Sequence, residues 1–164
     1  VPLSTAPIDA TGTFHLPLPK REAVTPYFLP FPTPEPSADS PCASLPTVAP
    51  AELKIFSLVL NVTKPDSTPV LLIAASFKQL SAPTVGGLGA NLLYADRDAR
   101  ITGEGKCSVP SSSFTSRYDV DLSTGWNTVV TKFDEYSVTP SGGTVVTEVY
   151  TGPLPAEIKW QKGG

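Results

Sequence analysis

The stretch Phe114–Leu122, FTSRYDVDL, decides the fold class of this chain. Its large apolar side chains occupy alternate positions: Phe114, Tyr118, Val120 and Leu122. Polar and charged side chains stand between them: Thr115, Arg117, Asp119 and Asp121. Successive side chains of a β-strand point to opposite faces of the sheet, so this alternation predicts a strand with one buried and one wet face. Half-buried strands of this kind are typical of antiparallel sheets.

Four strand-like segments precede this stretch, and the last two are Leu92–Ala95 and Arg100–Thr102, on either side of a turn. Residues Leu53–Val62 are apolar at both odd and even positions, which predicts a central strand covered on both faces. A turn separates them from Val70–Phe77, the next predicted strand.

Three more strand-like segments follow it. Trp126–Val138 changes parity along its length, which predicts a β-bulge near residues 131–132. Thr144–Thr151 is expected to pair back on it as a hairpin, and Ala156–Trp160 to form a last short strand. No segment shows helical periodicity, so residues 51–164 are predicted to be all-β. Seven or eight short strands favour an antiparallel β-sandwich of the immunoglobulin or transthyretin type.

Residues 1–50 are predicted to form an extended, proline-rich arm, because twelve of the nineteen prolines lie there. Each proline fixes φ, removes a backbone donor and pushes the preceding residue toward extended geometry. Ala10–Leu16 is the best strand candidate within the arm.

Aromatic side chains set this arm apart from a disordered linker, which is normally poor in them. Tyr27, Phe28 and Phe31 lie among five prolines between residues 26 and 36. We expect them to pack either on the protein's own domain or on a partner. Extended proline-rich segments dock well because little chain entropy remains to be lost, so these three residues are the predicted partner-binding site.

The chain has two cysteines, Cys42 in the arm and Cys107 after a predicted strand. In an exported protein they are expected to form one disulfide, with two free thiols as the alternative. The bridge would close a loop of 65 residues and stabilise the fold by about 4 kcal/mol.

Composition restricts both the partners and the compartment. The charged fraction is 16% and the net charge −3, which disfavours nucleic acid as a partner. The longest apolar run is strand-sized, so no transmembrane segment is expected. Many Ser and Thr, few Lys and only two cysteines fit an extracytoplasmic protein, in the periplasm, at the outer-membrane surface or secreted.

The sequence offers little for catalysis. His15 is the only histidine, and it lies in a strand-like segment without a neighbouring acid, so no cofactor, zinc site or catalytic triad is expected. Asp96 and Asp98 flank a turn and could supply oxygens to calcium, although Arg97 and Arg100 stand beside them. A carboxylate pair acting as general acid and base is a further alternative.

Residues 93–130 carry a resemblance. LYADRDARITGEGKC and then RYDVDLSTGWNTVV resemble segments of small, mostly uncharacterised lipoproteins and secreted β-sandwich proteins of bacterial envelopes. The resemblance implies a compartment and a fold, because its motifs describe strands and turns. Within it, Gly125 suits a turn with positive φ, Trp126 would plug the end of the fold, and Asn127 could bond the turn backbone.

These observations favour a non-enzymatic, exported cell-envelope protein. It would be an accessory or structural subunit of a surface assembly, docking on protein partners, or on copies of itself, through its aromatic arm. The alternative is a ligand-binding module for carbohydrate or calcium at the Asp96/Asp98 loop.

Overall fold

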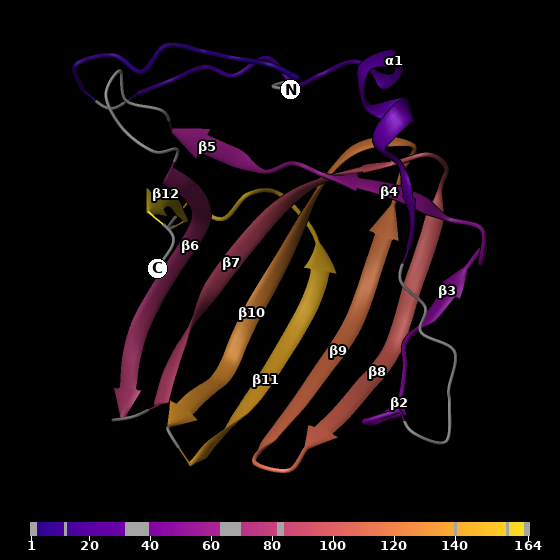
Figure 1. The fold of residues 1–164 in the computed structure, drawn as a ribbon, viewed down its shortest axis with the longest axis vertical. Coiled ribbons are helices and arrows are strands. Elements are labelled where there is room, and N and C mark those ends of the chain that lie inside the picture. Colours follow the sequence, from indigo (N-terminus) through magenta and orange to yellow (C-terminus); the bar gives the residue numbers. More distant parts are fainter. Residues whose placement is uncertain are drawn as a thin grey trace.

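The computed structural model describes residues 3–11, 13–31, 40–62, 70–81, 84–139, 141–156 and 158–162 (Figure 1). In this part of the chain, twelve strands belong to one sheet, accompanied by the short helix α1 (Arg21–Val24) and the 3-10 turn η1 (Thr25–Tyr27). The strands are β1 (Leu29–Pro30), β2 (Cys42–Ser44), β3 (Thr47–Ala49), β4 (Lys54–Ser57), β5 (Leu60–Val62), β6 (Val70–Ser81), β7 (Thr84–Ala95), β8 (Ala99–Val109), β9 (Ser112–Leu122), β10 (Gly125–Thr139), β11 (Gly142–Thr151) and β12 (Lys159–Lys162). No described helix has the length and apolarity needed to cross a membrane.

The all-β prediction is confirmed, but the β-sandwich is not. The described strands hydrogen-bond into a single sheet, which curls into an open half-barrel rather than pairing with a second sheet (Figure 1). Strand alternation shows that one face of each strand is apolar, yet it carries no information on what covers that face. Here the sheet itself curls, so that parts of one sheet come to face each other (Figure 1).

The central strands follow the order β7-β10-β11-β9-β8. The predicted hairpin is confirmed, because β10 and β11 pair antiparallel from Val129 and Thr151 to Thr139 and Gly142. The β-bulge exists but lies between Phe133 and Glu135, slightly after the predicted position. β11 also pairs with β9, in parallel. This pairing joins the β10–β11 hairpin and the antiparallel β8–β9 pair into one sheet.

The predicted central strand Leu53–Val62 is wrong as a single element, because it forms two strands, β4 and β5. Strands β6 and β7 pair only from Ala74 and Ala90 downward, and above this point β5 pairs with β6 while β4 pairs with β7. Leu58 donates its N–H to the carbonyl of Leu92 at 2.9 Å between the two. In Figure 1, β4 and β5 therefore cross the top of the sheet.

The main core lies at the upper end of the concave face, under these crossing strands. Its buried side chains come from three strands, β7, β8 and β9, and from the turn before β4: Leu53, Leu93, Ala95, Ala99, Ile101, Val120 and Leu122. Phe31, Val48, Ile55, Tyr118, Val129 and Val149 pack around them. The predicted inward face of β9 is thus buried at Val120 and Leu122, whereas Phe114 at its lower end is 43% exposed.

The arm is described in part, since residues 1, 2, 12 and 32–39 lie outside the described ranges. Ala10–Leu16 has no strand among its described residues, so that prediction is wrong there. Val24 of α1 is fully buried, and the indole Nε1 of Trp126 donates to the carbonyl of Pro19 at 2.9 Å. These contacts hold residues 19–24 on the upper end of the sheet.

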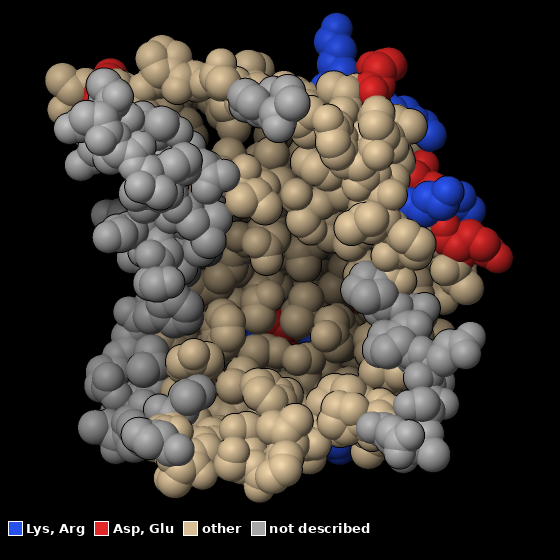
Figure 2. Space-filling view, in the orientation of Figure 1, with Lys and Arg blue, Asp and Glu red and all other residues tan. Residues whose placement is uncertain are grey.

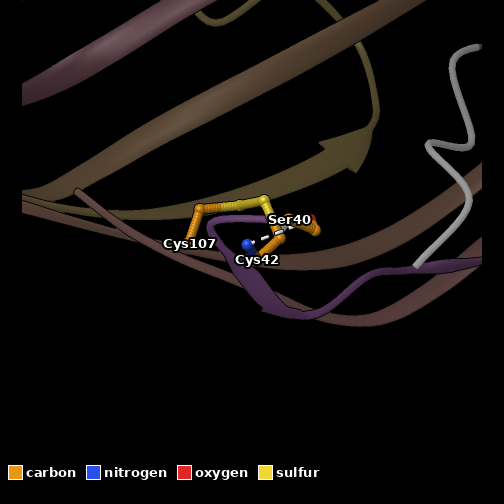
Figure 3. Close-up of a disulfide and its surroundings, with 3 residues drawn as sticks. All are labelled: Ser40, Cys42 and Cys107. Carbon is orange, nitrogen blue, oxygen red and sulfur yellow. Dashed lines mark hydrogen bonds between the residues drawn. A yellow bond between two sulfur atoms is a disulfide. The ribbon is translucent and has the colours of Figure 1, made fainter. Parts of the chain in front are cut away.

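The predicted disulfide between Cys42 and Cys107 is confirmed, with sulfurs 2.02 Å apart (Figure 3). It joins β2 to β8, and the Cys42 N–H donates to the hydroxyl of Ser40 at 3.2 Å. Together with β3, which also pairs with β8, this bridge ties the arm to that side of the sheet.

Candidate functional site

The structure separates the three aromatic residues predicted to bind a partner. Phe31 packs against the core and donates its N–H to the carbonyl of Leu53 at 2.8 Å. Phe28 lies on Tyr94, with ring centroids 5.8 Å apart. Only Tyr27 keeps a large exposed surface, at 47%. Phe31 and Phe28 therefore anchor the arm, and Tyr27 remains for contact with a partner.

Tyr27 belongs to an aromatic cluster that links the arm to the sheet. Its ring lies 6.3 Å from that of Phe56, which meets Trp126 edge-on at 6.1 Å. Trp126 in turn meets Tyr94 edge-on at 5.3 Å. Such pairs each contribute about 0.5–1.5 kcal/mol beyond the burial of area, so the cluster fixes the position of Tyr27.

The turn before Trp126 holds the predicted local structure. Gly125 has φ 112°, the left-handed region that favours glycine. The Asn127 side chain accepts from the Ser123 N–H at 3.0 Å and donates to the carbonyls of Ser123 and Gly125. The G-W-N element is thus a folding device that aims the indole into the aromatic cluster.

An open pocket of about 440 Å³ lies beside Tyr27. Its walls come from the arm and from β4, and almost all of its surface is apolar: Tyr27, Leu29, Pro30, Ile55, Phe56 and Ser57. The β1–β4 ladder, with Leu29 opposite Ile55, holds the two walls together. Leu29 is 68% exposed at the mouth of this pocket. None of the described residues that line it is charged, so it suits an uncharged, apolar group.

Sequence reasoning missed the half of this pocket that β4 supplies. Ile55 and Phe56 were assigned to a strand covered on both faces, although Phe56 is only half-buried. The aromatic character of both segments was visible. The pairing of Leu29 with Ile55 could not be predicted from sequence, because the two residues are far apart in the chain.

The predicted Asp96/Asp98 site is a pair of structural clamps. Asp96 accepts from the Lys54 N–H at 2.9 Å and pairs with Arg97 at 3.0 Å. Burial acts to raise the pKa of Asp96, but the bonds from Arg97 and Lys54 outweigh it and lower the pKa below its usual value. The carboxylate of Asp96 is thus engaged by Lys54 and Arg97.

Asp98 fastens the next turn of the chain. Its Oδ1 accepts from both the N–H and the hydroxyl of Thr124, at 2.7 and 2.8 Å, and these bonds lower its pKa. Among the described residues, no three His, Cys, Asp or Glu side chains gather as metal ligands would. Calcium or carbohydrate binding there stays a prediction that this geometry does not support.

Five further carboxylates of the central strands form ion pairs on the convex face. Arg100 bridges Asp119 and Asp121 at 3.0 and 3.1 Å. Lys132 bridges Asp134 and Glu148 at 2.7 and 3.0 Å, and the two bonds raise its pKa. Glu104 pairs with Lys106, which lowers its pKa, and also with Arg117. These carboxylates are each held by a cation on an open surface, unlike a general acid and base sharing a cleft.

His15 lies exposed in the arm, in a segment without strand structure. That the protein is not an enzyme stays a prediction from sequence. Compared with protein-family models, with curated proteins and with solved structures, the chain matches none of them significantly.

Proposed function

We propose that this protein is a non-enzymatic docking subunit of a cell-envelope assembly, and that it captures an apolar segment of a partner protein in the pocket beside Tyr27. The observation that carries the proposal is the exposure of Leu29 and Tyr27 at a fixed apolar pocket. Binding hot spots are rich in tyrosine and lie in such apolar depressions.

The rigidity of the pocket supports this role. One wall is held by the β1–β4 ladder and the other by the aromatic cluster of Tyr27, Phe56 and Trp126. A preformed site loses little conformational entropy when a partner binds, so a modest apolar contact is enough for useful affinity. The pocket volume lies within the range of ordinary ligand sites, which is room for one or two large side chains.

The disulfide supports an extracytoplasmic location. Structural disulfides form and persist in oxidising compartments, and Cys42–Cys107 closes a loop of 65 residues here. We therefore infer that the partner is also extracytoplasmic, at an outer membrane or cell surface.

A photo-crosslinking residue at position 29 tests the proposal, with the same residue at position 115 on the convex face as the matched control. We expect position 29 to give a defined adduct in the native envelope, absent for position 115. With the adduct partner purified, Leu29→Asp should weaken binding at least tenfold in calorimetry, while Thr115→Asp leaves it unchanged. Leu29 is mostly exposed, so the fold should survive the change. Equal affinity of Leu29→Asp and the unmodified protein would refute the site.

A further inference from the structure

The strands β8, β9, β10 and β11 keep charged side chains off their concave face, whereas their convex face carries both charged and apolar ones. Their register places every charged side chain on the convex face: Arg100, Glu104, Lys106, Arg117, Asp119, Asp121, Lys132, Asp134, Glu135 and Glu148. The concave positions of the same strands carry only uncharged residues. A small core at one end of the concave face would not require the rest of that face to be free of charged residues.

The lower half of the concave face is not covered by the described residues. Three large apolar side chains are exposed there, Val109 at 45%, Phe114 at 43% and Tyr136 at 42%. Val145 lies between the last two, because it is opposite both Phe114 and Tyr136 in the register. Figure 2 shows this region as a hollow whose visible surface is uncharged apart from a small spot on its floor.

A row of charged residues, Lys132, Glu148 and Arg117, runs across β10, β11 and β9 at neighbouring positions. Their side chains lie on the convex face, where they take part in the ion pairs described above.

The polar groups that the described floor of the hollow offers a ligand are side-chain hydroxyls, such as that of Tyr136. Thr147, only 5% exposed, donates its hydroxyl to that of Ser116 at 2.8 Å. Among the described residues, no buried side-chain nitrogen or oxygen lacks a partner. The backbone groups of these central strands are engaged in the ladders on both sides. A bound peptide could not pair with these backbone groups, and each amide group left without a partner would cost about 1–3 kcal/mol.

We propose that this hollow binds an aliphatic chain, such as the acyl chain of a lipid. Methylene groups need no hydrogen bonds, and each buried one contributes about 0.8 kcal/mol. The convex face of a second copy is a poor occupant, because it would bring ion pairs against an apolar floor. This site is distinct from the pocket beside Tyr27, which lies at the upper end of the molecule on the arm and β4.

Titration of the purified, disulfide-bonded protein with cis-parinaric acid, a fluorescent eighteen-carbon fatty acid, tests this site. We expect saturable binding with about one chain per protein. Phe114→Lys should weaken it at least tenfold, because a cation in the hollow must be desolvated against the chain. The adjacent control Thr115→Lys, on the convex face, should bind like the unmodified protein. Lysine attracts the carboxylate of the probe, so a loss with Phe114→Lys cannot arise from charge repulsion.

A second pair guards against a folding defect. Tyr136→Lys should also weaken binding, and its neighbour Ser137→Lys should not, with circular dichroism confirming the fold of all four variants. Leu29→Asp should leave probe binding intact, which separates this site from the docking pocket. The proposal is overturned if no saturable binding occurs, if both members of each pair behave alike, or if only Leu29→Asp abolishes binding.

Discussion

The upper and lower halves of the concave face are built from the same four strands, β8 to β11, with the same alternation. They differ in how exposed their apolar side chains are. In the upper half, Val120 and Leu122 are buried under Leu53, which is itself fully buried. In the lower half, Phe114 and Tyr136 remain more than two-fifths exposed. Alternation decides which face of a strand is apolar, and only the crossing segments decide which part of that face is core. The open half is therefore an apolar surface that none of the described segments covers.

One of the two largest expected effects comes from the disulfide, which ties the arm to β8 beside the open half. Replacing both Cys42 and Cys107 by alanine should lower the free energy of unfolding by about 4 kcal/mol, because the unfolded chain regains the entropy of a 65-residue loop. Urea unfolding of the variant and of the oxidised protein measures this. A loss below about 1 kcal/mol would mean that the arm is held by its packing alone.

Matched truncations in the two halves test the comparison itself. Leu53→Ala should cost about 3–5 kcal/mol, since it empties a fully buried position in the closed half. Phe114→Ala removes a larger side chain from the open half, yet it should cost less than about 1 kcal/mol. Both values come from urea unfolding. Equal losses would show that the open half is core in solution and would remove the case for a ligand there.

Trp126→Phe tests how firmly the arm closes the upper end. The phenyl ring keeps much of the contact with Phe56 and Tyr94, but the hydrogen bond from the indole to the carbonyl of Pro19 is lost. We expect a loss of about 1 kcal/mol, with faster amide hydrogen exchange in residues 19–28 than in β9. Unchanged exchange in the arm would indicate that Val24 and Phe28 hold it without the tryptophan.

The sequence contained the two-faced character of the sheet but not its closure. FTSRYDVDL identified both faces of β9 correctly, because period-two alternation is a local property of the chain. The division of Leu53–Val62 into β4 and β5 could not be foreseen, since it results from β6 and β7 separating above Ala74 and Ala90. Parity indicated a bulge in β10, but its position depends on the partners in β7 and β11.

For the same reason, only part of the candidate site could be predicted from the sequence. The aromatic arm stood out by composition, and the two cysteines allowed a single bridge. Which aromatic residues would anchor the arm and which would stay exposed depended on contacts with Tyr94, Phe56 and Leu53, distant in sequence. Local pattern thus predicts what a segment is able to do, and the long-range pairings select among those possibilities.

The smallest expected effect concerns the turn that Asp98 clamps at the closed end. Its bonds with Thr124 lower its pKa in the folded protein, so the stabilisation is present above the unfolded value of about 3.9 and is lost as the pH falls through the lower folded value. Asp98→Asn keeps an acceptor oxygen but removes the charge. The variant should therefore be slightly less stable than the unmodified protein at pH 7, and the difference should vanish toward pH 2. Urea midpoints across this range measure it. A difference that stays constant with pH would assign the role of Asp98 to the shape of the turn and not to its charge.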